Sequence, residues 1–155
     1  MIVYYCCNVV PNDVLDFLVQ EDEYNPQDYI PDLDERKIIL SNLVGNGQLA
    51  IIKCTDNVMI LLRRLTSWVG IFDTKVRPNT SVKEVIRAYK DFFSWAKEYT
   101  AYYKLETRTP FEKYGRVMAK ATGALLEGTR QYSYMDKERN MKTEYEYGYV
   151  LERDQ

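Results

Sequence analysis

The residues best suited to chemistry lie where a predicted strand, residues 68–76, passes through a short polar turn into a predicted helix, residues 82–99. Ser81 and Glu84 have the S-x-x-E spacing of a capping box, which marks the beginning of that helix. The apolar residues of the helix repeat at the helical period and form one stripe. Because the first backbone N–H groups of a helix have no partners within it, this turn is a natural seat for an anion such as a pyrophosphate.

The residue types that are missing exclude several kinds of catalysis. The sequence contains no histidine, so it lacks the usual general base and the commonest metal ligand, and Ser-His-Asp and Cys-His mechanisms are ruled out. Cys6 and Cys7 are adjacent in a predicted strand and should point to opposite faces, so we expect no metal site there. With Cys54 they form an odd set, which predicts buried core residues in a reducing compartment rather than disulfides.

Composition and charge indicate a globular protein with an ordinary core. The chain has 155 residues, of which 46% are hydrophobic and 28% charged, and this predicts one domain over residues 1–155. The net charge of −2 argues against nucleic acid as a partner. No apolar run approaches the roughly 20 residues that cross a membrane. The N-terminal residues do not have the pattern of a signal peptide, so we expect a cytoplasmic protein without a membrane partner.

Periodicity and turn residues predict the element order β-α-α-β-β-β-α-β-α-β-β, with a buried first strand and an acidic solvated loop at 21–25. Asp32 and Glu35 have capping-box spacing at the start of the second helix, which Gly45 and Gly47 end. The predicted strands are 1–7, 48–54, 57–65, 68–76, 101–109, 125–134 and 143–152, and the other helices are 14–19, 82–99 and 110–123. The fold class is therefore α+β, a mixed and mostly antiparallel sheet with helices on both faces.

This element order resembles that of the GNAT superfamily of acyl-CoA-dependent N-acetyltransferases over essentially the whole chain. The most similar local text is ATGALLEGTR at 121–130, which is similar to the end of the family's fourth helix and the strand that follows. The resemblance implies that the strand at 68–76 splays from the strand at 101–109, and that the pantetheine arm of acyl-CoA enters the gap. The chain is also loosely similar to small GNAT-like bacteriophage proteins, some of which are virion components.

The turn at 77–82 corresponds to the family's pyrophosphate-binding loop, Q/R-x-x-G-x-G/A. Arg77 matches its first position, but Thr80 and Val82 replace the residues that let the backbone approach the phosphates. Pro78 removes one further N–H donor. The cofactor-binding candidates that the resemblance implies are Arg77, Asn79, Thr80, Ser81 and Val82.

The resemblance also implies catalytic positions. In the family, a tyrosine four residues before the glycine that matches Gly123 often protonates the leaving thiolate, and this chain has Ala119 there. Tyr114 lies more than one turn earlier and is not taken as its substitute. A carboxylate on the fourth or fifth strand is often the general base, which makes Asp73 and Glu106 candidates. As an alternative, both are ordinary strand residues or salt-bridge partners.

Two other groups of side chains are open to more than one interpretation. Lys113, Arg116 and Lys120 share one helix face, which could hold a CoA phosphate or an acidic partner, but we favour a simple solvated face. Tyr145 and Tyr147 belong to a stripe with Tyr149, which we expect to be core or interface because basic residues are not interleaved with it.

Two functions remain. The departures from the family's motifs favour a non-catalytic GNAT-like scaffold that binds other proteins, such as virion components of a bacteriophage, and uses no cofactor. The 14 tyrosines support this interpretation, because tyrosine is enriched at protein interfaces. The alternative is an acetyl-CoA-dependent N-acetyltransferase with a divergent cofactor loop. Either protein could be a homo-oligomer, and neither is expected to need a metal.

Overall fold

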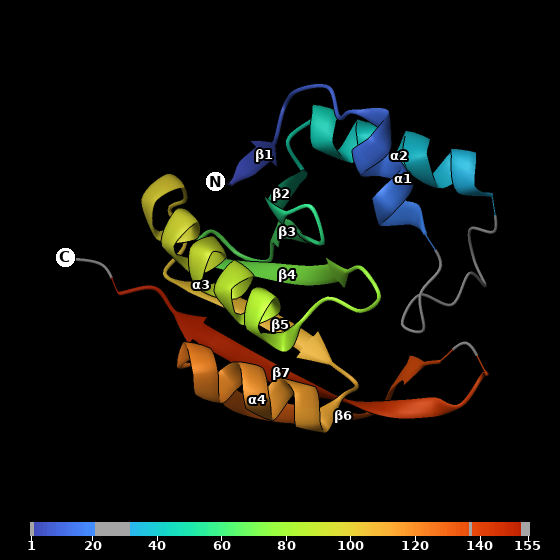
Figure 1. The fold of residues 1–155 in the computed structure, drawn as a ribbon. Coiled ribbons are helices and arrows are strands. Elements are labelled where there is room, and N and C mark those ends of the chain that lie inside the picture. The colour runs from blue at the N-terminus through green and yellow to red at the C-terminus, as the bar shows by residue number, and fades with distance from the viewer. Residues whose placement is uncertain (1, 21–31, 137, 153–155) are drawn as a thin grey trace.

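The computed structural model describes residues 2–20, 32–136 and 138–152, and these form a seven-stranded sheet with helices on both faces (Figure 1). The element order and the mixed α+β class are as predicted. The acidic loop predicted at 21–25 lies outside the described residues. The elements are β1 (Val3–Tyr5), α1 (Asn12–Val19), α2 (Leu33–Gly45), β2 (Leu49–Thr55), β3 (Val58–Arg64), β4 (Val69–Val76), α3 (Val82–Tyr99), β5 (Lys104–Thr109), α4 (Glu112–Thr122), β6 (Leu125–Met135) and β7 (Met141–Val150).

The strands lie in the order β1-β2-β3-β4-β5-β7-β6. Every neighbouring pair is antiparallel except β4 and β5, which run parallel. A parallel pair needs a long crossover, and α3 supplies it by carrying the chain back from the end of β4 to the start of β5. The parallel pair lies in the middle of the sheet, between two antiparallel groups of strands.

Apolar residues on both faces of the central strands explain why helices cover both sides. Ile51 and Ile52 are neighbours on β2, point to opposite faces and are both 0% exposed. Ile51 packs with Val14 and Phe17 of α1, and α2 completes that layer. Ile52 packs in the core beneath α3, which contributes Phe92. Figure 1 shows α1 and α2 together at one end of the sheet, while α3 and α4 cross the remaining strands.

The beginning of α3 is fixed by two sets of side-chain hydrogen bonds. The hydroxyl of Ser81 accepts from the N–H of Glu84 at 3.1 Å, as the capping spacing predicts. The Glu84 carboxylate does not return to the cap. It accepts from the hydroxyl of Thr55 at 2.9 Å and from the amide of Asn57 at 3.0 Å. The turn between β2 and β3 therefore holds the first turn of α3, next to the candidate cofactor loop.

Two of the predicted elements differ from the structure. The first strand was expected to be buried over residues 1–7, but β1 is a short edge strand in which Val3 and Tyr4 are each 46% exposed. An edge strand has one neighbour and less cover, and a sequence pattern does not show where an edge lies. The fourth helix begins at Glu112 rather than at Pro110, although it ends as predicted, with Gly123 in the left-handed conformation at φ +83°.

The tyrosine stripe of β7 is part of the core, as expected. Tyr149 stacks on Phe93 of α3 with ring centroids 4.0 Å apart, and Tyr147 is 5% exposed beneath α4. Tyr147 fits there because position 115 of α4 is a glycine. A Cβ on Gly115 would lie 2.5 Å from the Tyr147 ring. The three basic residues on the other side of α4, at 113, 116 and 120, are exposed, in agreement with a solvated face.

Gly115→Ala is expected to destabilise the protein by about 1–3 kcal/mol, because the new methyl group overlaps the Tyr147 ring and one of them must move. Urea unfolding followed by far-ultraviolet circular dichroism measures the change. Gly45→Ala in α2 is the matched control, since no atom lies within 4 Å of its added Cβ. That variant should be neutral or more stable by roughly 0.5–1 kcal/mol. Equal effects of the two substitutions would show that the contact with Tyr147 does not matter.

Candidate functional site

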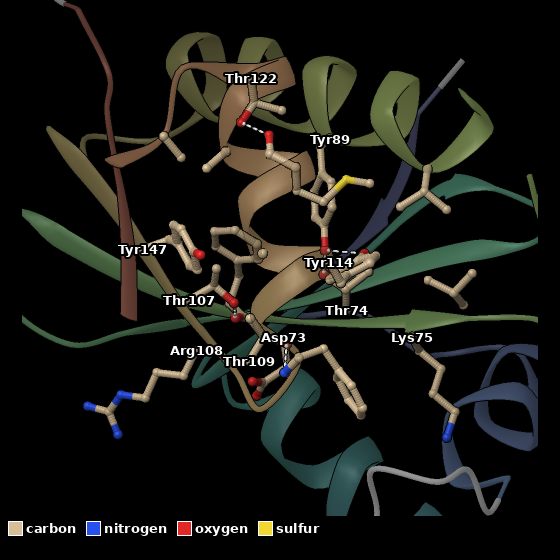
Figure 2. A pocket seen from close by; sticks show the side chains of 18 of the residues that line it. Asp73, Thr74, Lys75, Tyr89, Thr107, Arg108, Thr109, Tyr114, Thr122 and Tyr147 are labelled. Atoms are coloured by element: carbon tan, nitrogen blue, oxygen red, sulfur yellow. Dashed lines mark hydrogen bonds between the residues drawn. The ribbon is translucent and has the colours of Figure 1, made fainter. Parts of the chain in front are cut away.

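The central feature of the site is a pocket where β4 and β5 separate. The two strands pair over only three positions, which end at Ile71 opposite Glu106. One residue further, the hydroxyl of Thr107 donates to the carbonyl of Phe72 at 2.8 Å. Beyond this bond β4 stays with β3 and β5 stays with β7. A pocket of about 540 Å³ lies in the opening, as Figure 2 shows. This is the splay that the family resemblance implied.

A chain of hydroxyl groups crosses the pocket on the side of α3 and α4. Tyr89 of α3 donates to the hydroxyl of Thr74 on β4 at 2.8 Å, and its oxygen lies 3.1 Å from the hydroxyl of Tyr114 on α4 (Figure 2). Burial raises the pKa of Tyr89, so this tyrosine keeps its proton at neutral pH. Tyr114 is half-buried and lines the pocket. Both helices thus bring phenolic groups to the point where the strands open.

Asp73 approaches the same pocket from the other face of the sheet. Its neighbour Thr74 points towards α3, so the alternation of strand side chains directs Asp73 to the face covered by α1 and α2. Asp73 is an exposed residue, yet the protein atoms around its carboxyl group limit its hydration and raise the pKa of Asp73. The positive charges of Arg63 and Arg108 oppose this effect without cancelling it. A carboxyl group with a raised pKa is suited to accept a proton near neutral pH.

Glu106, the other candidate base, lies elsewhere. It is not among the residues that line the pocket, and its carboxylate is 3.2 Å from the ammonium group of Lys104. Lys104 also lies 2.7 Å from the carboxylate of Glu127 on β6. The hydrogen bond that Lys104 donates to Glu127 raises the pKa of Lys104 and keeps it charged. The structure therefore brings Asp73 into the pocket and places Glu106 in an ion-pair cluster on the sheet.

The candidate cofactor loop is folded against itself. The N–H of Thr80 donates to the carbonyl of Arg77 at 3.3 Å, and the Thr80 hydroxyl donates to the same carbonyl at 2.8 Å. Asn79 has φ +66°, which together with Pro78 before it is the arrangement of a type II turn. Thr80 thus uses its amide within the turn. Among the five candidates, Arg77, Thr80 and Val82 line the pocket, whereas Asn79 and Ser81 do not.

The Arg77 side chain is oriented by the elements beside the loop. Its Nε donates to the carbonyl of Asp56 at 2.9 Å, and its guanidinium lies 4.5 Å from the centre of the Phe17 ring. A guanidinium has five N–H groups, so these contacts leave further donors for a ligand. The N–H groups of Val82 and Lys83, in the first turn of α3, are the other donors suited to an anion.

Lys75 adds a buried positive charge to the pocket wall. Its side chain is 7% exposed, and its ammonium group donates to the carbonyl of Gln20 at the end of α1. This contact joins α1 to β4 at the edge of the pocket. The sequence gives no signal for Lys75, because one lysine in a strand carries no local pattern.

The sequence also does not show that the phenolic groups of Tyr114 and Tyr147 line the pocket. Tyr114 was set aside because of its spacing from Gly123, and yet it reaches the pocket. Tyr147 lines the pocket with a buried hydroxyl that has no hydrogen-bond partner in the described part of the chain. The available signal was helical: Tyr114 and Met118 are four residues apart on the inner face of α4. That spacing indicates core packing and does not reveal that a pocket lies beneath.

Two other classes of site find no support in the described ranges. No helix there is long and apolar enough to cross a membrane. Within the same residues, no group of three or more histidine, cysteine, aspartate or glutamate side chains could hold a metal ion. The pocket between β4 and β5 is therefore the candidate functional site.

The sequence matches no protein-family model and no curated protein. Solved structures do resemble the fold. A ribosomal-protein-alanine N-acetyltransferase from Brucella melitensis superposes with a TM-score of 0.71 at 12% identity, covering 97% of this chain and 99% of that one. A chimeric spermidine N-acetyltransferase from Vibrio cholerae gives 0.76 at 8% identity, covering 97% and 95%.

A third similar structure contains the cofactor of this class of enzyme. The phosphinothricin acetyltransferase from Sinorhizobium meliloti, solved with acetyl-CoA, has a TM-score of 0.69 at 10% identity and covers 97% of this chain and 88% of its own. Identities this low establish similarity of fold alone. This chain therefore has the fold of the GNAT superfamily of acetyltransferases.

Proposed function

We propose that this protein binds an acyl-CoA in the pocket between β4 and β5 and transfers its acyl group to an amine. The observation that carries the proposal is the splay itself, which leaves a pocket of about 540 Å³ between two strands that would otherwise pair. A non-catalytic scaffold would have no need of this gap, and its own side chains could fill it. The alternative interpretation from the sequence, an N-acetyltransferase with a divergent cofactor loop, thus has the better structural support.

The free edge of β4 suits an extended ligand that carries amide groups. The carbonyl of Phe72 is the last group of this edge that is bonded to β5, through the Thr107 hydroxyl. From Asp73 to Val76 the strand pairs with β3 on one side, while its β5 ladder has already ended at Ile71. Unpaired backbone N–H and C=O groups on an edge bind an extended chain much as another strand would. The pantetheine arm of CoA has two amide groups, and so it is suited to this edge.

The loop after β4 suits the phosphates of CoA only in part. Arg77 and the first N–H groups of α3 offer charge and donors, and Lys75 lies further along the wall. In contrast, Pro78 has no N–H, and the amide of Thr80 is already bonded to Arg77. We therefore expect side-chain charge to provide more of the phosphate binding than in a glycine-lined loop, and the affinity to be moderate.

In this proposal, two side chains move the protons of the reaction. A bound acyl-CoA supplies a thioester carbonyl that an amine can attack, with formation of a C–N bond and loss of the C–S bond. Asp73 is suited to accept the proton that the attacking nitrogen loses, and its raised pKa helps. Tyr114 is suited to donate a proton to the leaving sulfur, with Tyr89 and Thr74 orienting its hydroxyl. Asp73 and Tyr114 reach the pocket from opposite faces of the sheet.

The acceptor is proposed only as a primary amine. The printed names of the similar structures include acetyltransferases of spermidine, phosphinothricin and a ribosomal protein's alanine. These acceptors differ in size and charge, so the shared fold does not select one of them.

A non-catalytic scaffold is the second candidate, and the self-bonded loop is the observation that favours it. In this proposal the pocket is a remnant, and the protein acts by binding other proteins, such as bacteriophage virion components, in the host cytoplasm or as a homo-oligomer. The bacterial enzymes reported above do not bear on a virion role. Binding of acetyl-CoA separates the two candidates directly.

Acetyl-CoA is expected to bind with an affinity in the micromolar range and to raise the melting temperature as the pocket saturates. Arg77→Ala should weaken binding by about tenfold, through loss of one charged contact with phosphate. Isothermal calorimetry measures both values. Arg87→Ala is the matched control, because Arg87 is exposed on α3 and does not line the pocket. If millimolar acetyl-CoA neither binds nor shifts the melting temperature, the scaffold is the better proposal.

Tyr114→Phe is expected to lower kcat by about a hundredfold while the affinity for acetyl-CoA stays nearly constant, because the hydroxyl acts on the leaving sulfur rather than on binding. Release of the CoA thiol with spermidine and other primary amines as acceptors provides the assay. Tyr132→Phe is the control, since Tyr132 is 74% exposed on β6. An unchanged kcat in Tyr114→Phe would remove this tyrosine from the mechanism without affecting the binding result.

Asp73→Asn is expected to become progressively more stable than the wild type as the pH rises above about 4. The folded-state pKa of Asp73 is raised, so the wild type loses stability as the pH rises from the ordinary carboxyl range through the raised pKa. Below the ordinary carboxyl range, Asp73 is protonated in both the folded and the unfolded protein, and the pH-dependent difference in stability vanishes. Urea unfolding at several pH values measures the difference. Asp56→Asn, where the side chain is 91% exposed, should show little such trend, and a parallel trend would contradict the assignment.

A further inference from the structure

The pocket continues past the point where β4 and β5 separate. The last paired position of the two strands is Ile71 opposite Glu106. Leu105 is paired with Gly70 one position earlier, and its side chain still lines the pocket. Tyr149 of β7 lies opposite Leu105 and lines the pocket too. Part of the pocket therefore lies over the closed sheet, on the face that α3 and α4 cover, and we call this part the inner section.

Helix α4 runs alongside the inner section and ends at the closed part of the sheet. Tyr114 and Thr122 are two four-residue steps apart on one face of this helix, and both line the pocket. At 1.5 Å per residue, Thr122 lies about 12 Å beyond Tyr114 along the helix axis. The next strand, β6, begins with Leu125, which pairs with Gly148, and Gly148 lies opposite Glu106. The helix thus carries the pocket wall from the hydroxyl chain to the level of the last β4–β5 pair.

The inner section has apolar walls. Phe93, Leu105 and Met118 line it and are each at most 7% exposed. The hydroxyl of Thr122 donates to the carbonyl of Met118 at 2.7 Å, so it needs no polar partner from a ligand. Apolar walls suit a hydrocarbon chain better than an amine or a carboxylate. The charged residues that line the described pocket all belong to its open part: Asp73, Lys75, Arg77, Arg108 and Glu144.

Ala119 leaves room in the inner section, because its side chain is a single methyl group. It is half-buried and lines the pocket from α4, between Tyr114 and Thr122. We infer that the inner section holds an acyl chain longer than acetyl, with butyryl and hexanoyl as the chains we commit to. This inference rests on the proposed acyl transfer and names the group that passes to the amine nitrogen as the C–S bond of the thioester breaks.

The proposed position of the acyl-CoA directs its acyl group to the inner section. With the phosphates at Arg77 and the sulfur beside Tyr114, the acyl group is the part nearest to the closed sheet. The carbonyl carbon stays open to an amine from the side of Asp73, through the gap between the strands. The carbons beyond it cannot pass between β4 and β5, because these strands are paired up to Ile71. They therefore extend over the sheet, along α4.

The test measures how affinity depends on the length of the acyl chain. Acetyl-CoA, butyryl-CoA and hexanoyl-CoA are titrated into the wild-type protein by isothermal calorimetry, and CoA without an acyl group is the reference. Butyryl-CoA is expected to bind about tenfold more tightly than acetyl-CoA, because two more CH₂ groups are buried. Hexanoyl-CoA should bind at least as tightly as butyryl-CoA. If acetyl-CoA binds and the longer chains bind no more tightly, the inference is overturned while the proposed acyl transfer stands. If no acyl-CoA binds, both are overturned.

A pair of variants locates the chain along α4. Ala119→Leu fills part of the inner section and should lower the preference for butyryl-CoA over acetyl-CoA from about tenfold to about twofold. Ala121→Leu is the matched control, since Ala121 is also half-buried on α4 but does not line the pocket, and it should keep the full preference. Equal preferences in the two variants would overturn the inference. Should Ala119→Leu not fold, as judged by circular dichroism, the smaller change Ala119→Val replaces it, and the wild-type series decides without any variant.

Discussion

The architecture depends on how briefly β4 and β5 pair. Each strand has a second partner that it follows to its end: β4 runs beside β3 as far as Val76, and β5 runs beside β7 as far as Thr109. The parallel ladder between them stops at Ile71, and the two halves of the sheet then diverge. Polar side chains and the tyrosines of α3 and α4 line the opening instead of backbone hydrogen bonds. The pocket, the polar groups that line it and the proposed chemistry all depend on the early end of the β4–β5 ladder.

The loop after β4 differs from a glycine-rich loop in the groups that it could offer to an anion. A glycine-rich loop offers backbone amides, whereas the turn here spends the Thr80 amide on its own closure. What remains is the charge of Arg77 and the first turn of α3, which Glu84 fixes to the β2–β3 turn.

The phenol that reaches the pocket does not lie at the position that the family resemblance assigns to a tyrosine. The position that the family resemblance assigns to a catalytic tyrosine is Ala119 here, and the phenol that reaches the pocket comes from Tyr114, nearer the start of α4. Its hydroxyl is held by Tyr89, a residue of another helix. Near the N-terminus, Cys7 has a left-handed backbone, and both Cys6 and Cys7 are exposed rather than buried as the sequence predicted.

The sequence by itself determined the features that depend on neighbours along the chain. Ser81 and Gly123 mark helix ends through bonds and backbone angles within a few residues, and the alternating tyrosines of β7 follow from the strand period. Tertiary structure decided which of Asp73 and Glu106 faces the pocket, how exposed β1 is and where the Cys7 sulfur points. These outcomes depend on where a ladder ends, on which strand forms an edge, and on contacts between residues far apart in the chain. Periodicity carries no information about such contacts, because it repeats identically whatever packs against it.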